Sequence, residues 1–191
     1  MAVITRQTKE TDITVSLTLA GSGQADIDTG IGFFDHMLTA LAVHGGLDLT
    51  VRCRGDLEVD GHHTVEDVGI VLGQALAQAV GDKGSIARFG AFYVPMDEAL
   101  ARVVLDFSGR SYLVFQAAFA PQLLGTYDPA LTEEFFRAVA ANCGLTLHIT
   151  VLYGQNDHHK IEAIFKAFGH ALQIAAAPNG SAGPLSTKGV L

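Results

Sequence analysis

The sequence predicts an α+β or mixed α/β fold that arose by internal duplication. The main observation is a repeated order of motifs, in which a strand pattern precedes His-His-x-x-Glu and then Gly-x-Ala-Leu. These motifs are GLDLTV (46–51), HHTVE (62–66) and GQAL (73–76) in the first half, and GLTLHI (144–149), HHKIE (158–162) and GHAL (169–172) in the second. The matching order and spacing indicate two copies of one structural unit.

Each half is expected to contain a strand, a turn, a strand, a helix, a strand and a helix. SLTLAGSG (16–23) and VLDFSGRS (104–111) alternate apolar residues before a glycine-containing turn, which is typical of a hairpin strand. A phenylalanine-rich segment with helical spacing follows in both halves. The break between halves is expected near residues 81–84. We therefore expect one domain over 1–191, with repeats at about 1–84 and 85–180 and a C-terminal tail.

Composition favours a compact chain with a sizeable core. Of the 191 residues, 49% are hydrophobic and 17% are charged, and no low-complexity tract is present. The modest charge suggests that surface is buried between subunits, so we expect a homo-oligomer. The net charge of -8 without a Lys/Arg run argues against nucleic-acid or anionic-membrane binding, and leaves room for a local basic pocket that takes a small anion.

The cysteines and the N-terminal residues favour a cytoplasmic protein. Cys53 and Cys143 lie far apart without CxxC spacing, so buried free thiols in a reducing compartment are expected rather than a disulfide. MAVITRQTKE (1–10) has no apolar signal region. The most apolar stretches, such as 68–80, are too short or too interrupted to span a bilayer.

The doubled His-His-x-x-Glu motif predicts a doubled metal site. On a helix, the first His and the Glu are four residues apart and the second His and the Glu three apart, so all three can share one side. A single motif of this kind more often caps or decorates a solvated helix. Its recurrence at matching places in a repeat favours metal binding, and because adjacent histidines diverge by roughly 100°, one motif can supply two ions.

The repeat extends each motif by one upstream residue. His36 precedes Gly46 by ten residues, and Glu134 precedes Gly144 by ten. The candidate ligands are His36, His62, His63, Glu66, Glu134, His158, His159 and Glu162. Shared between two ions, they leave coordination positions open if the ions are six-coordinate, which indicates catalysis. Imidazole and carboxylate without thiolate suits Mn, Fe, Co, Ni or Zn, and Glu134 shifts the balance toward Mn.

Several longer motifs resemble those of the imidazoleglycerol-phosphate dehydratase family, essentially over residues 5–191. They are DTGIGFFDHM (28–37), DGHHTVEDVGIVLGQAL (60–76), PMDEAL (95–100), NDHHKIEAIFKAFGHAL (156–172) and LSTKGVL (185–191). The resemblance implies dehydration of D-erythro-imidazole glycerol phosphate to imidazole acetol phosphate in histidine biosynthesis. It also implies an α+β fold with sheets flanking a layer of helices, two Mn²⁺ ions per active site, and a 24-mer with sites between subunits.

The resemblance assigns roles residue by residue. Seven of the eight candidate ligands match family ligands, whereas Glu134 stands where many members have His. Glu10 matches the acid/base residue at the substrate; by residue type alone it would be an exposed strand-edge carboxylate. The family's substrate and phosphate pattern falls on Arg88, Arg110, Lys166, Ser186, Thr187 and Lys188. His44 either hydrogen-bonds the substrate or supports a ligand, and Asp97 either orients a neighbour or is a solvated turn residue.

The implied chemistry accounts for two metal ions. The hydrogen that is lost lies next to a carbinol and is barely acidic, so an electron source must first expel the hydroxyl. We hypothesise a metal-stabilised imidazolate that gives a diazafulvene-like intermediate, with Glu10 carrying protons. The alternatives are a binuclear metallohydrolase acting on a phosphate ester, and a metal-storage or assembly module. A phosphotransferase or RNA-binding relative lacks support, because the chain has no Gly-rich nucleotide loop.

Overall fold

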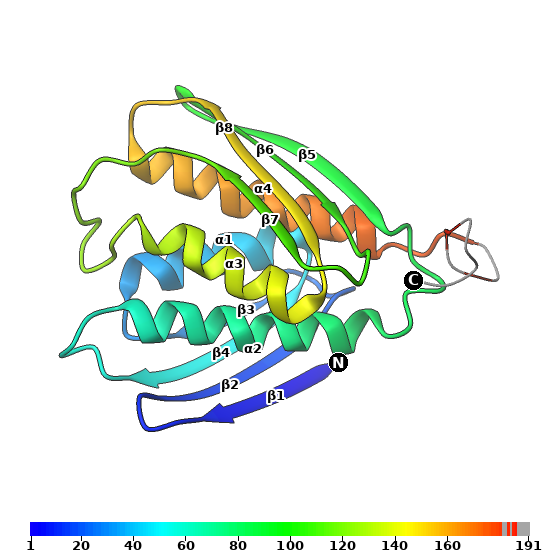
Figure 1. Cartoon of the computed structure of the whole chain (residues 1–191), viewed down its shortest axis with the longest axis horizontal. Coiled ribbons are helices and arrows are strands. Elements are labelled where there is room, and N and C mark those ends of the chain that lie inside the picture. Colours follow the sequence, from blue (N-terminus) through cyan, green and yellow to red (C-terminus); the bar gives the residue numbers. More distant parts are fainter. Residues whose placement is uncertain (181–182, 184, 187–191) are drawn as a thin grey trace.

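Two four-stranded sheets enclose the helices of the protein (Figure 1). The computed structural model describes residues 1–180, 183, 185 and 186. The first half consists of β1 (Ala2–Gln7), β2 (Thr11–Thr18), β3 (Ala25–Asp28), α1 (Gly32–Gly45), β4 (Asp48–Gly55) and α2 (His62–Val80). The second half consists of β5 (Phe89–Met96), β6 (Ala99–Asp106), β7 (Tyr112–Gln116), α3 (Leu131–Cys143), β8 (Thr146–Tyr153) and α4 (Asp157–Ala176). The expected α+β fold with duplicated halves is confirmed.

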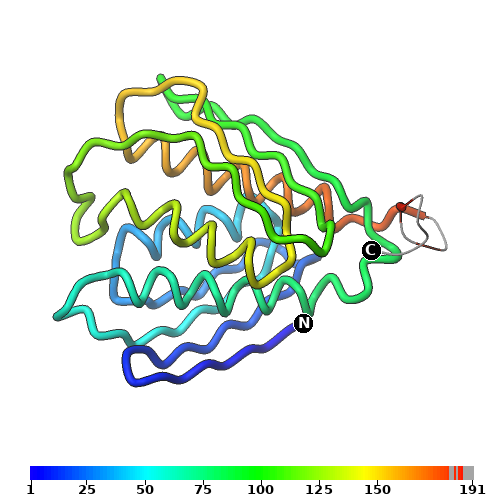
Figure 2. Tube along the Cα trace, viewed as in Figure 1, coloured from blue at the N-terminus to red at the C-terminus, as the bar shows by residue number. Residues whose placement is uncertain are grey.

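The two halves share one sheet topology. The strand orders are β1-β2-β4-β3 and β5-β6-β8-β7, and in each sheet the last strand runs parallel to its neighbour while the other pairs are antiparallel. Along the trace, the strands of the first half, blue to cyan, lie on one side of the helices, and those of the second half, green to yellow, lie on the other (Figure 2).

The hairpin expected at residues 16–23 is wrong, because β4 lies between β2 and β3. The side chain of Asp48, at the start of β4, accepts hydrogen bonds from the backbone N–H groups of Ser22 (2.7 Å) and Gln24 (3.1 Å). These bonds hold the segment between β2 and β3 at the start of β4. The chain crosses β4 there, and β3 pairs in parallel with the edge of β4 opposite to β2. The tight hairpin instead joins β1 to β2, and each half has one more strand than expected.

The inner faces of the sheets and the helices form one hydrophobic core. Alternate residues of β2 are buried, as are alternate residues of β6, which is the period of a strand with one covered face. Helices of opposite halves pack together, α1 against α4 and α2 against α3. The close approach requires Gly73, since a Cβ there would lie 2.8 Å from the carbonyl oxygen of Val139. A Cβ on Gly169 would likewise lie 2.7 Å from the carbonyl oxygen of Leu41.

Both His-His-x-x-Glu motifs lie in the first turn or two of a long helix. α2 begins at His62, whose backbone N–H donates to Asp60 at 2.7 Å. Asn156 caps α4 and accepts from the backbone N–H groups of His158 (2.9 Å) and His159 (3.4 Å). None of the helices in the described ranges is long and apolar enough to cross a membrane.

Candidate metal centre

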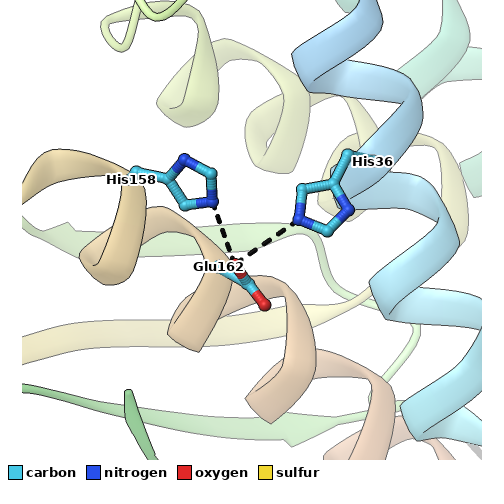
Figure 3. Close-up of side chains that lie close together, drawn as sticks. All are labelled: His36, His158 and Glu162. Atoms are coloured by element: carbon cyan, nitrogen blue, oxygen red, sulfur yellow. Dashed lines mark hydrogen bonds and ion pairs between the residues drawn. The ribbon is translucent and has the colours of Figure 1, made fainter. Parts of the chain in front are cut away.

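Three of the predicted ligands converge from both halves of the chain. His36 extends from α1, and His158 and Glu162 lie one turn apart on α4 (Figure 3). Oε2 of Glu162 lies 3.1 Å from Nε2 of His158 and 3.5 Å from Nε2 of His36. One ligand atom from each residue lies within 4.8 Å of the others. Two imidazoles and a carboxylate around one point suit a divalent ion of the Mn to Zn series.

Glu162 is held as a carboxylate at the centre of this group. Its side chain is only 8% exposed, and Oε1 lies 2.6 Å from Nζ of Lys166. Burial opposes ionisation, but Lys166, His36 and His158 together lower the pKa of Glu162 below its ordinary value. The predicted phosphate ligand Lys166 therefore lies at the metal group, as the cationic partner of Glu162.

The equivalent residues on α2 and α3 do not converge in the same way. Nε2 of His62 lies 3.6 Å from Oε2 of Glu66, and the Glu66 side chain is 44% exposed. Glu134 instead pairs with Arg137 one turn later, at 3.4 Å. Among the residues that the structure describes, the group around Glu162 is the one set of three candidate ligands that meets.

The second histidine of each motif is bound through Nδ1 by a carboxylate. For His63 this is Asp56, with oxygens at 3.0 and 3.1 Å. For His159 it is Glu98, at 2.7 Å. These bonds raise the pKa of both imidazoles above the ordinary value. Backbone N–H of Asn156, the His159 ring and backbone N–H of Gln155 lower the pKa of Glu98 to about 2.

Asp56 and Glu98 were not among the site residues predicted from the sequence. The available signal for Glu98 was its place in the PMDEAL motif immediately before a strand, which matches the place of Glu10 before the strand at Thr11. Asp97, which was left open, lies 3.7 Å from Nε2 of His159 and is exposed.

Glu10 lies beside the first motif. It belongs to the turn between β1 and β2, its side chain is 53% exposed, and Oε1 is 3.8 Å from Nε2 of His63. A cavity of about 500 Å³ opens next to the same motif, with Ile31, Leu57, Asp60, His62 and Leu131 in its lining. This volume is in the range of small-molecule sites.

The remaining predicted substrate residues lie away from the Glu162 group or have partners of their own. Arg88, at φ 73°, donates to both carboxylate oxygens of Asp106, at 2.6 and 3.0 Å, and to the carbonyl oxygen of Leu185. Arg110 follows β6 and is exposed. Ser186 is in the described tail, one residue after Leu185, whereas Thr187 and Lys188 lie outside the described residues.

His44 lies on α1 against a histidine of α4. Its ring centroid is 5.4 Å from that of His170. Burial, followed by the charges of Lys166 and His170, lowers the pKa of His44. A neutral imidazole at this place can donate or accept a hydrogen bond.

Known proteins match this chain over nearly its whole length. The family model described as Imidazoleglycerol-phosphate dehydratase matches residues 29–172. The imidazoleglycerol-phosphate dehydratase of Desulfotalea psychrophila is 55% identical over 190 residues, covering 100% of this chain and 96% of the relative. That of Acetivibrio thermocellus is 59% identical over 189 residues, covering 98% and 97%.

Solved structures agree with these sequence matches. The crystal structure of imidazoleglycerol-phosphate dehydratase from Staphylococcus aureus subsp. aureus N315 has a TM-score of 0.82 at 46% identity, covering 94% of this chain and 100% of that chain. The enzyme from Pyrococcus furiosus in complex with (S)-C348 has a TM-score of 0.86 at 38% identity, covering 98% and 100%. The predicted enzyme class is confirmed: the chain belongs to the imidazoleglycerol-phosphate dehydratase family, hydro-lyases of histidine biosynthesis.

Proposed function

We propose that this chain dehydrates D-erythro-imidazole glycerol phosphate to imidazole acetol phosphate with two Mn²⁺ ions per active site. The observation that carries the metal dependence is the convergence of His36, His158 and Glu162 from two halves of the chain. The remaining proposed ligands are His62, His63, Glu66, Glu134 and His159. When bound at these residues, the ions would supply Lewis-acid stabilisation of negative charge on the imidazole ring of the substrate, which is the chemistry that the hypothesised imidazolate and diazafulvene-like intermediate require.

The carboxylate partners of His63 and His159 determine which ring nitrogen is available to bind metal. A carboxylate only accepts hydrogen bonds, so the Asp56 and Glu98 contacts place the hydrogen of His63 and His159 on Nδ1. In the neutral form of each ring, Nε2 is then the nitrogen whose lone pair is available to a metal ion. Glu162, held ionised by Lys166, contributes a carboxylate oxygen.

Glu10 is the proposed proton carrier. Its carboxylate extends from the turn between β1 and β2 to within 3.8 Å of His63, and it is half exposed, so a substrate at the motif can reach it. We propose that Glu10 first protonates the leaving hydroxyl and then takes the proton from the neighbouring carbon.

Binding of the phosphate and the substrate chain is assigned to His44, Arg88, Arg110, Lys166, Ser186, Thr187 and Lys188. Arg88 supports this assignment, because its guanidinium donates to the carbonyl oxygen of Leu185, immediately before Ser186. The contact brings the start of the tail next to a cation that can bind phosphate. Anchoring the phosphate keeps the reacting carbons aligned with Glu10.

The proposed assembly is a homo-oligomer of 24 chains with sites between subunits, in the cytoplasm. Within one chain, His62 and Glu66 lie about half exposed, and Glu134 is paired with Arg137. A neighbouring subunit that adds ligands would complete the coordination of an ion at these exposed residues. Cys53 and Cys143 are both free and buried, which suits a reducing compartment.

Turnover of imidazole glycerol phosphate tests this function. The protein is stripped of metal with a chelator and then supplied with Mn²⁺, Zn²⁺ or Mg²⁺. We expect imidazole acetol phosphate to form again with Mn²⁺, and inorganic phosphate not to be released. Absence of dehydration under every metal contradicts the proposal, and release of phosphate would support the metallohydrolase instead.

A further inference from the structure

Glu10 and Glu98 occupy equivalent places in the two halves. Each is the last residue of the hairpin turn before a strand, Glu10 before β2 and Glu98 before β6. Each points its carboxylate at the second histidine of the motif in its own half. They reach different nitrogens, however: Glu98 lies 2.7 Å from Nδ1 of His159, whereas Glu10 lies 3.8 Å from Nε2 of His63.

Glu98 is fixed by three hydrogen bonds. Oε2 accepts from Nδ1 of His159, and Oε1 accepts from the backbone N–H groups of Gln155 (3.0 Å) and Asn156 (2.7 Å). Asn156 is also the residue that caps α4. The β5–β6 turn is therefore tied to the start of the helix that carries the motif, and the His159 ring has one orientation and one tautomer.

In the first half, a different carboxylate binds Nδ1 of the second histidine. Asp56, in the loop after β4, binds Nδ1 of His63. That loop spans residues 56–61, whereas the loop after β8 spans only 154–156 and reads Gly-Gln-Asn, without a carboxylate. In the described part of the chain, the Glu10 carboxylate has no hydrogen bond, only its long contact with His63. In the first half, Asp56 therefore binds Nδ1 of the second histidine, so Glu10 does not make that bond. In the second half, the shorter loop has no carboxylate, and Glu98 binds Nδ1 instead.

We propose that Glu98 is a positioning residue that holds His159 for metal binding, and that the equivalent turn carboxylates have divided two tasks, positioning for Glu98 and proton transfer for Glu10. The proposal rests on the proposed function in one respect, that His159 binds metal. It assigns Glu98 no contact with the substrate.

The test compares Mn²⁺ affinity and Mn²⁺ rescue in the full-length protein. Glu98→Gln should weaken Mn²⁺ binding by roughly 10–100-fold, as is typical for the carboxylate partner of a ligand histidine. Its turnover should return toward the wild-type level at saturating Mn²⁺. Glu10→Gln should bind Mn²⁺ within about twofold of wild type, while its turnover stays low at every Mn²⁺ concentration. Asp82→Asn, in the turn after α2, is the matched control and should change neither property.

Wild-type affinity in Glu98→Gln, or equal loss of affinity in Glu10→Gln, overturns the division of tasks. A turnover defect in Glu98→Gln that saturating Mn²⁺ does not relieve also overturns it. If Glu98→Gln does not fold, Glu98→Asp decides: this shorter carboxylate should withdraw from His159 and weaken Mn²⁺ binding several-fold, and unchanged affinity refutes the proposal. Failure of the proposed function is distinct, since the wild-type protein itself would then neither bind Mn²⁺ nor dehydrate the substrate.

Discussion

The two equivalent ligand groups of the duplicated fold differ in how far they are assembled. Around Glu162, three side chains from α1 and α4 meet within one chain, whereas Glu134 on α3 forms no such group of three with His62 and Glu66 on α2. The backbone arrangement is the same in both. Two local differences lie one turn after a candidate ligand. Arg137 follows Glu134 but Thr39 follows His36, and Lys166 follows Glu162 but Ile70 follows Glu66.

Arg137 attracts the Glu134 carboxylate. Thr39 is uncharged and its hydroxyl donates to the carbonyl oxygen of Asp35, at 2.8 Å, so it forms no ion pair that would draw His36 away from Glu162. Duplication therefore reproduces helix positions, and nearby charges decide which side chains meet.

The largest expected contrast is between Glu162→Gln and Glu66→Gln. Glu162 contacts two histidines and Lys166 and is nearly buried, whereas Glu66 contacts one histidine and is half exposed. We expect Glu162→Gln to weaken Mn²⁺ binding by roughly 100-fold, with Glu66→Gln losing clearly less. Glu162→Gln should also lower the free energy of unfolding by about 1–3 kcal/mol, because Lys166 loses its anionic partner. Equal losses in the two variants would mean that the groups do not differ in this way.

Replacing Glu134 by the residue at its repeat position should change the choice of metal. In Glu134→His, the imidazole cannot form the ion pair with Arg137, and nitrogen is a softer ligand than carboxylate oxygen. The ratio of Zn²⁺ to Mn²⁺ affinity should rise on the order of tenfold. Competition between the two metals measures it, with His36→Glu as the reciprocal variant. An unchanged ratio would place Glu134 outside the metal site.

Acid should weaken metal binding through both halves. The hydrogen bond that His63 donates to Asp56 raises the pKa of His63 above 6.5, and the bond that His159 donates to Glu98 does the same for His159. Without metal, both rings therefore keep their second proton to a higher pH than an ordinary histidine, and the imidazolium form cannot bind metal. Mn²⁺ affinity should be full above the raised pKa values and fall as pH decreases through them.

Mn²⁺ titrations between about pH 5.5 and 8.5 measure this dependence around the histidine range. In Asp56→Asn, the neutral amide replaces the anion, so the pKa of His63 should fall. The part of the loss of Mn²⁺ affinity that is due to protonation of His63 should then occur at lower pH. A flat profile would show that these histidines do not titrate in competition with metal.

The smallest expected effect is that of Arg137→Thr, which copies Thr39 of the first half. The Arg137–Glu134 pair is exposed, and such pairs contribute only about 0–1 kcal/mol. Releasing Glu134 should therefore raise Mn²⁺ affinity by no more than about fivefold. Isothermal titration against wild type detects it, and weaker binding would mean that Arg137 supports the site.

The repeat in the sequence was enough to predict the duplicated halves and the helices that carry His158 and Glu162. It also placed His36 among the candidate ligands, because matching positions relative to a strand are a property of the chain alone. The grouping of His36 with His158 and Glu162 was not predicted, since the repeat aligns His36 with the motif of its own half. The strand order was not predictable in this way, since it depends on the contact of Asp48 with Ser22 and Gln24 from another segment.

The positioning role of Glu98 was equally hidden in the sequence. It depends on the difference in length between the loops at 56–61 and 154–156. It also depends on the packing of β6 against α4, which brings Glu98 to His159. The pairing of Glu134 with Arg137 spans three residues and has a local signal, an acidic residue one turn before a basic one.

We propose that both His-His-x-x-Glu motifs bind metal and that both ions are needed for dehydration. The most direct measurement is turnover of imidazole glycerol phosphate by metal-free protein as Mn²⁺ is added in known ratio to the chain, with bound Mn²⁺ determined by mass spectrometry of the metal. We predict that turnover rises until about two Mn²⁺ ions are bound per chain. Full turnover at one bound ion, or turnover in the verified absence of metal, would contradict a mechanism that needs two ions.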